Sequence, residues 1–133
     1  MTRSELREHI FQMLFGIEFY TGEEMEDQLG LYLDTLDDIK ESDYSYMKTK
    51  VGHIVERLEE IDGLLNEETT GWKTSRMNKV DLTIMRLALY EIRWDDDVPA
   101  GVAINEAVEL AKKYSSDEGP SFVNGVLAKF AKE

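Results

Sequence analysis

The sequence predicts an all-α fold of about seven helices, and three features support that prediction. Apolar residues recur at intervals of three and four along most of the 133-residue chain, with no β-type alternation. The two prolines, Pro99 and Pro120, both lie in short breaks, so long helices are possible elsewhere. The segment VDLTIMRLALYEI (80–92) is apolar on most sides, which is typical of a helix packed at the centre of a fold.

The first half of the chain predicts three helices. Two capping boxes, each a Thr followed three residues later by a Glu, begin helices over about 3–20 and 21–38. The two boxes are Thr2 with Glu5 and Thr21 with Glu24. A third helix is expected over about 44–61, and Asp62-Gly63 marks a turn after it.

The second half predicts four more helices. A short one is expected from Leu64 until Gly71 ends it, followed by the apolar helix over 78–94. Asp95-Asp96-Asp97 forms a solvated turn, and Pro99 suits the first turn of the helix after it. That helix pairs Glu109 with Lys113, and the last helix follows a break at 115–120.

Two residues stand out inside these helices. Arg86 lies in the apolar run, so we expect a carboxylate or a carbonyl to pair with it, because an unpaired buried guanidinium is costly. Gly125 lies within the last helix, where glycine is a poor helix former, and this suggests the close approach of another backbone.

Composition limits the class of protein. No stretch approaches the roughly 20 apolar residues needed to cross a bilayer, and the N-terminus lacks a secretion signal, so we expect a cytoplasmic protein. There is no cysteine. There is also no Gly-rich phosphate loop and no set of metal ligands, and His53 with Glu56 lacks the second such pair that a bundle metal site needs. We expect neither an enzyme nor a cofactor.

The net charge of −13 is unusual for an RNA-binding protein, because phosphate neutralisation normally requires a basic surface. An acidic chain instead favours a basic partner, or remains soluble through self-repulsion. Composition leaves these two interpretations open.

The C-terminal half nevertheless resembles the NusB family of transcription antitermination proteins. The segments of resemblance are Asp81, Arg86 to Ala88, Tyr90-Glu91, Val98-Pro99, Val102 to Lys112 and Phe122 to Leu127. LREHIFQMLF (6–15) more weakly resembles the first helix of the family. The resemblance implies one domain over 1–133, built of two stacked small helical bundles, about 1–61 and 62–133.

The resemblance also implies a function and partners. NusB-like proteins bind the single-stranded boxA element of ribosomal RNA leaders and pair with ribosomal protein S10, also called NusE. The complex then joins RNA polymerase and other Nus factors and suppresses premature termination. Because NusE is basic, an acidic face on this chain would attract it.

The resemblance places RNA contacts at an arginine-rich start of the first helix. Only two arginines occur there, interleaved with Glu5 and Glu8, and polar residues around the last break are candidates to extend the patch. The candidate RNA-binding residues are Arg3, Arg7, Lys73, Arg76, Lys112, Lys113, Ser121 and Asn124. The candidate NusE-binding residues are Trp72, Met77 and Asp81.

Two other functions remain to be weighed. The sparse arginines and the acidic charge also fit a protein-interaction scaffold that binds NusE and has little RNA affinity of its own. A NusB-like domain also precedes ribosomal RNA cytosine methyltransferases, but the sequence ends at Glu133 without a cofactor-binding α/β domain, so we do not expect that activity. No heptad pattern selects an oligomeric state.

Overall fold

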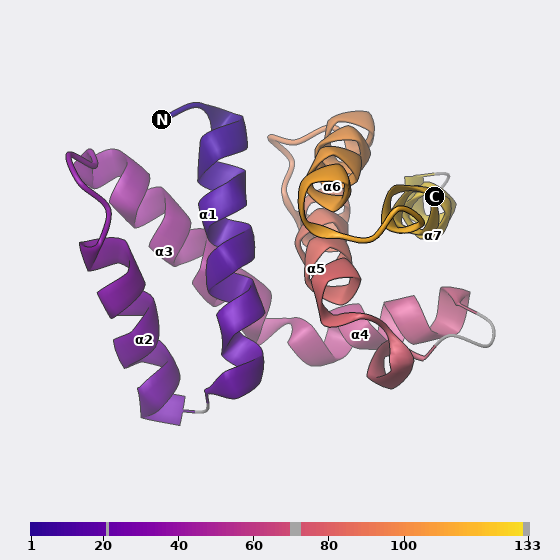
Figure 1. Cartoon of the computed structure of the whole chain (residues 1–133), viewed down its shortest axis with the longest axis horizontal. Coiled ribbons are helices and arrows are strands. Elements are labelled where there is room, and N and C mark those ends of the chain that lie inside the picture. The colour runs from indigo at the N-terminus through magenta and orange to yellow at the C-terminus, as the bar shows by residue number, and fades with distance from the viewer. Residues whose placement is uncertain (21, 70–72, 132–133) are drawn as a thin grey trace. The chain divides into compact units, whose positions relative to one another are not determined.

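Seven α-helices and two 3₁₀ helices make up this computed structural model, which describes residues 1–20, 22–69 and 73–131 (Figure 1). No strand occurs among those residues, so the predicted all-α fold is confirmed. The helices divide into two compact units, Met1–Val55 and Glu56–Glu133. No helix in the described residues is both long and apolar enough to cross a membrane.

The first unit contains three of the α-helices. They are α1 (Arg3–Gly16), α2 (Gly22–Asp34) and α3 (Glu41–Glu56), with the 3₁₀ helix η1 (Ile17–Phe19) after α1. The predicted capping box begins α1: Glu5 N–H donates to Thr2 Oγ1 over 3.1 Å, and Thr2 N–H donates to Glu5 Oε1 over 3.0 Å. Thr21, from the second predicted box, lies outside the described residues. The first two helices both end before their predicted limits, at Gly16 and Asp34.

The helix predicted over 44–61 is in fact two helices. α3 ends at Glu56, and α4 (Leu58–Glu68) begins after Arg57, whose φ of −107° and ψ of 9° lie outside the helical region. The turn predicted at Asp62-Gly63 is wrong, because both residues lie inside α4. Gly71, predicted to end this helix, lies outside the described residues.

The second unit is organised around α5. After α4 it comprises the 3₁₀ helix η2 (Thr74–Arg76), α5 (Lys79–Trp94), α6 (Ala100–Tyr114) and α7 (Gly119–Ala131). α5 packs against α4, α6 and α7, and every residue from Asp81 to Glu91 is buried, which confirms its predicted central position. Burial on all faces explains why its sequence is apolar on most sides.

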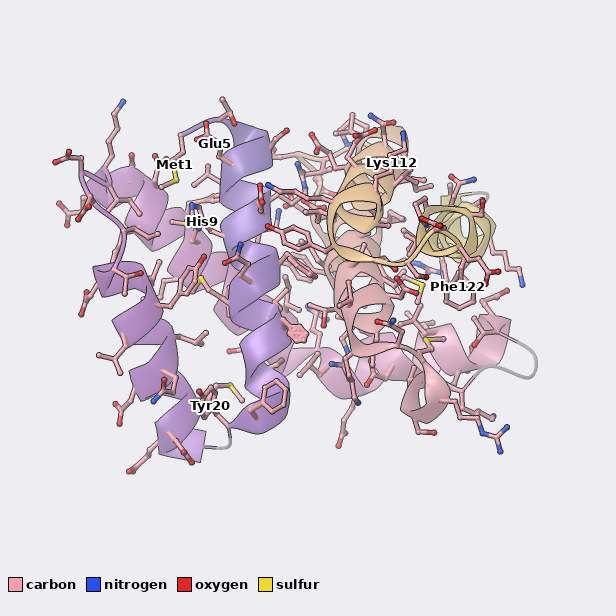
Figure 2. The ribbon with its side chains drawn as sticks, in the orientation of Figure 1. Met1, Glu5, His9, Tyr20, Lys112 and Phe122 are labelled. Atoms are coloured by element: carbon pink, nitrogen blue, oxygen red, sulfur yellow. The ribbon has the colours of Figure 1, made fainter. Side chains whose placement is uncertain are left out.

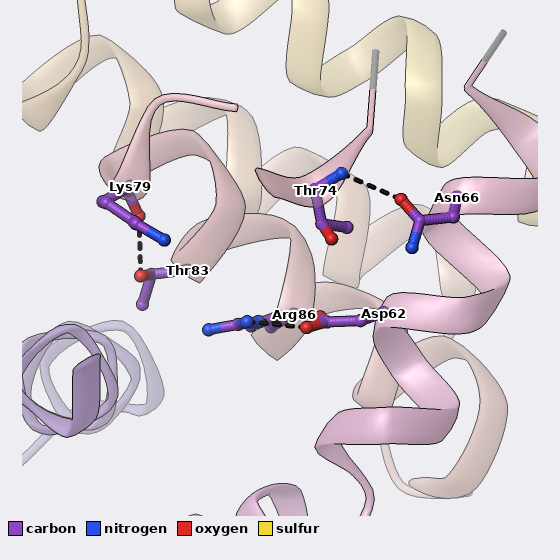
Figure 3. A network of polar contacts seen from close by, with 6 residues as sticks. All are labelled: Asp62, Asn66, Thr74, Lys79, Thr83 and Arg86. Atoms are coloured by element: carbon purple, nitrogen blue, oxygen red, sulfur yellow. Dashed lines mark hydrogen bonds and ion pairs between the residues drawn. The ribbon is translucent and has the colours of Figure 1, made fainter. Parts of the chain in front are cut away.

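Arg86 is one of the charged residues that α5 buries, and it is paired as predicted. Its Nε donates to Asp62 Oδ1 over 2.8 Å and its Nη2 donates to Asp62 Oδ2 over 2.7 Å (Figure 3). The fork of the guanidinium thus meets both oxygens of the carboxylate, which is the strongest arrangement for such a pair. Nearby, Thr74 N–H donates to Asn66 Oδ1 over 2.8 Å and connects η2 to α4.

The pairing of Glu109 with Lys113 stays a prediction, and Glu109 also accepts from Lys112 Nζ at 3.3 Å. No described atom lies within 4 Å of a Cβ added at Gly125, so the expected close approach there is wrong. The glycine of α7 with close neighbours is Gly119, and they are side chains: an added Cβ would collide with the Ser115 side chain and lie 3.2 Å from Asp81 Oδ1.

Candidate nucleic-acid interface

The first unit holds two of the candidate RNA contacts, one turn apart on α1. Arg3 is exposed: its Nη1 donates to Tyr46 Oη on α3 over 3.2 Å, and its guanidinium carbon lies 5.3 Å from the centre of the Tyr46 ring. These contacts hold the guanidinium at the surface, where a phosphate can approach it.

Arg7 differs from Arg3 because it is buried. Only 6% of its surface is exposed, so its guanidinium offers little area to an RNA strand in this structure. The sequence offers a modest sign of this difference, since Arg3 is the first residue of α1 whereas Arg7 lies one turn before Phe11. The role of Arg7 in RNA binding stays a prediction, and its burial adds a structural role.

The interleaved Glu5 is engaged in the cap of α1 (Figure 2). Hydrogen bonds from Thr2, first from its backbone N–H and then from its side chain, hold the pKa of Glu5 below its ordinary value. The carboxylate therefore stays ionised and lies next to the N-terminal helix dipole. It also contributes negative charge beside Arg3, which weakens the attraction of this end of α1 for phosphate.

The second unit brings two further candidates into one groove. Ser121 and Asn124, both exposed on α7, line an open groove of about 490 Å³ together with Asn105 and Gly101 of α6. Asn105 was not among the predicted site residues, although an exposed asparagine in the middle of a helix is a useful signal, because asparagine is a mediocre helix former. Two amides and a hydroxyl thus converge on one surface.

Lysines lie on the same helices but outside this groove. Lys112 and Lys113 occupy the last turn of α6 and are exposed (Figure 2 labels Lys112). Lys112 is paired with Glu109, whereas Lys113 Nζ lies 5.5 Å from the centre of the Tyr114 ring. The ion pair of Lys112 is exposed and weak, so a phosphate can compete with Glu109 for its ammonium group.

Lys73 and Arg76 belong to a different part of the second unit. Lys73 caps η2 and Arg76 lies within it, and both side chains are exposed. η2 packs against α4, whereas the groove above is built from α6 and α7. The structure therefore does not gather these two cations with Ser121 and Asn124 in one groove.

Two of the three candidate NusE contacts do share a site. Met77 and Asp81 line a cavity of about 210 Å³ with Glu118, Gly119 and Phe122. Asp81 is 7% exposed, and Ser115 Oγ donates to its Oδ1 over 2.5 Å. Trp72, the third candidate, lies outside the described residues. Glu118 and Phe122 were not predicted to belong to this site.

Comparison with known proteins decides the family. The sequence model of the NusB family matches residues 4–132, nearly the whole chain. The chain belongs to the NusB family. It is 53% identical over 131 residues to the transcription antitermination protein NusB of Agathobacter rectalis, covering 98% of this chain and 100% of that protein. It is 54% identical over 129 residues to the NusB of Lachnoclostridium phytofermentans, covering 97% and 98%.

Solved structures of the NusB family show the same fold. The T. maritima NusB crystal structure superposes with a TM-score of 0.90 at 34% identity, covering 100% of this chain and 92% of that one. A NusB solved with NusE and double-stranded RNA superposes with a TM-score of 0.84 at 25% identity, covering 99% and 98%. Because coverage is nearly complete in both directions, the likeness extends over both units.

Proposed function

We propose that this protein is a transcription antitermination factor that binds RNA together with NusE. The observation that most supports the proposal is the NusB family match over residues 4–132, combined with the likeness to a NusB solved with NusE and RNA. Curated relatives that are more than half identical to this chain are antitermination proteins by name. Such a factor works in the cytoplasm with RNA polymerase and other Nus factors, and the proposal assigns it no catalytic step.

The proposed RNA is the single-stranded boxA element of ribosomal RNA leaders. Unpaired bases expose their hydrogen-bonding edges, and amide and hydroxyl side chains can read those edges. The groove between α6 and α7 presents such groups from Asn105, Ser121 and Asn124. Lys112 and Lys113, at the end of α6, would contact phosphates and position the strand, since phosphate contacts position and base contacts specify.

NusE is proposed to bind at the cavity lined by Met77 and Asp81. The Glu118 side chain at this cavity is an exposed carboxylate, so the site is suited to a basic protein. The overall charge of −13 would accelerate the encounter with such a partner.

A second function is favoured by the burial of Arg7. With only 6% of that residue exposed, the basic end of α1 has a single exposed arginine, Arg3. A protein with so few phosphate contacts could act as a scaffold that binds NusE and has little RNA affinity of its own.

Fluorescence anisotropy distinguishes the two functions. A labelled boxA-type oligonucleotide and a scrambled control are titrated at about 0.1 M salt, with and without NusE from the same organism. The proposal predicts sequence-selective binding that NusE strengthens. Binding of NusE without RNA binding would establish the scaffold, and binding of neither would leave only the shared fold.

Variants localise the RNA site. Asn124→Ala should weaken the boxA complex about fivefold, because one hydrogen bond contributes about 1 kcal/mol. The double variant Lys112→Gln/Lys113→Gln should reduce the salt slope, by about 0.7 for each phosphate of the single strand that is no longer neutralised. Lys40→Gln/Lys48→Gln, which removes two exposed lysines of the first unit, is the charge-matched control.

A further inference from the structure

Helix α2 has several apolar side chains that the first unit covers only in part. Leu33 is the buried residue of this helix, whereas Met25 and Leu29 are half-buried and Leu31 is 58% exposed. Phe19, just before α2, is 68% exposed. Met25, Leu29 and Leu31 line one groove, and apolar side chains that stay at the surface around a groove are typical of an interaction site.

A groove of about 320 Å³ lies between α1 and α2 beside these residues. Its apolar lining consists of Met13, Ile17, Tyr20, Met25, Leu29 and Leu31. Figure 2 shows Tyr20 where the chain passes from α1 to α2. The volume is at the small end of the range of about 300–1,000 Å³ for ligand sites, which suits one or two anchoring side chains of a larger partner.

The polar end of the groove is already satisfied within the protein. Tyr32 Oη of α2 donates to Gln12 Oε1 of α1 over 3.0 Å, and His9 Nδ1 lies 2.7 Å from the same Tyr32 Oη. These bonds hold α2 against α1 and fix the width of the groove. An occupant would therefore gain its contacts from the apolar part.

Carboxylates surround the exposed leucine. On a helix, residues three and four apart share a face, so Glu24, Asp27, Leu31 and Asp34 lie along one side of α2. The three carboxylates are exposed, and none forms an ion pair with another described residue. Residues 22–43 contain nine carboxylates and one lysine, which accounts for more than half of the net charge of −13.

We propose that the groove between α1 and α2 docks a cationic amphipathic helix of a partner protein. Leucine-type side chains at helical spacing would enter the apolar groove, as in other helix-in-groove complexes. Lysines or arginines one turn to either side would face Asp27 and Asp34. Like charges oppose a second copy of this chain on the same face, and they also oppose RNA. None of the groove residues belongs to the candidate RNA or NusE sites, so the proposal goes beyond the proposed function.

The test uses a peptide of defined chemistry. Calorimetry measures the binding of two 14-residue peptides to the full-length protein. One has leucine and lysine in an amphipathic helical pattern, and the other has the same composition in scrambled order. The amphipathic peptide should bind at least about tenfold more tightly, because only it presents a continuous apolar stripe. Amide shifts in ¹⁵N spectra should concentrate in residues 12–35.

Leu31→Ser should weaken binding of the amphipathic peptide about tenfold, since it removes one buried anchor from the complex. Val102→Ser, which changes an apolar side chain of the second unit that is 46% exposed, is the matched control and should leave affinity unchanged. Asp27→Asn/Asp34→Asn alters only exposed groups and should also weaken binding, whereas Asp96→Asn/Asp97→Asn should not.

Three results would overturn the proposal. The first is equal affinity of the two peptides, and the second is equal loss of affinity in the Leu31→Ser and Val102→Ser proteins. The third is a concentration-dependent dimer in sedimentation that Leu31→Ser abolishes, because it would assign the groove to a second copy of the chain.

Discussion

Asp62 and Arg86 form a largely buried charge pair in the second unit. The Arg86 side chain is 10% exposed and that of Asp62 is 24% exposed, and two short hydrogen bonds join them. Removing the Asp62 carboxylate takes two charge-assisted hydrogen bonds from a largely buried guanidinium, which costs about 3 kcal/mol.

Asp62→Asn should therefore lower the free energy of unfolding by about 3 kcal/mol, measured by urea denaturation with an unchanged m-value. Glu60→Gln is the matched control, because the ion pair between Glu60 and Arg57 is exposed and contributes less than about 1 kcal/mol. Equal effects of the two substitutions would show that the Arg86 guanidinium is solvated and not held by the fold.

Glu5 provides a prediction about pH. Its pKa is held below the ordinary value of 4.5 by hydrogen bonds from Thr2, so its contribution to stability is fully present above that ordinary value. The contribution is lost as the pH falls through the lowered pKa. NMR titration should show the pKa of Glu5 rising in Thr2→Ala and staying low in Thr2→Ser, which keeps the hydroxyl. A pKa unchanged in Thr2→Ala would mean that the backbone N–H alone holds it.

Residue-level patterns could be read from the sequence where the partner is a near neighbour in the chain. The capping box of Thr2 and Glu5 was predicted because both members lie in one helical turn. The need of Arg86 for a partner was also predicted, but not its identity, since Asp62 lies 24 residues away. The burial of Arg7 was not predicted, although Arg7 lies one turn before Phe11 and Arg3 lies at the first residue of α1.

At the scale of the elements, the break between α3 and α4 was not predicted. Val51, Ile54, Leu58 and Ile61 continue the spacing of one buried stripe across the break. Periodicity reports which residues are buried and not whether one helix or two present them. The central position of α5 was predictable, because burial on all its faces requires apolar residues on most of them.

The two glycines of α7 have opposite roles. Gly125→Ala should stabilise the protein by about 1 kcal/mol, since alanine is the better helix former and nothing described lies within 4 Å of the added Cβ. Gly119→Ala should destabilise it by about 1–3 kcal/mol, because the new methyl group would collide with Ser115. Thermal and urea unfolding measure both changes.

The double variant Ser115→Gly/Gly119→Ala should recover part of the stability, because it removes both Ser115 atoms, Oγ and Cβ, that the new methyl group would strike. A Gly119→Ala protein as stable as Gly125→Ala would show that the start of α7 shifts freely and does not dock closely on Ser115.

At the scale of the whole molecule, the strong negative charge can be read directly from the sequence. The net charge of −13 falls on both units, but the nine carboxylates of residues 22–43 make the first unit the more acidic for its length. RNA binding by such a molecule requires local groups and not an overall positive field. The convergence of Asn105, Ser121 and Asn124 on one groove required the structure, because these residues come from two helices.

The most direct test of the proposed function is transcription read-through with purified components. RNA polymerase transcribes templates that carry a terminator after either a boxA sequence or its scrambled form, in the presence of the other Nus factors. Adding this protein together with NusE should raise read-through on the boxA template only, and Asn124→Ala should reduce that increase. Read-through that is unchanged by the protein, or raised equally on both templates, would contradict an antitermination role.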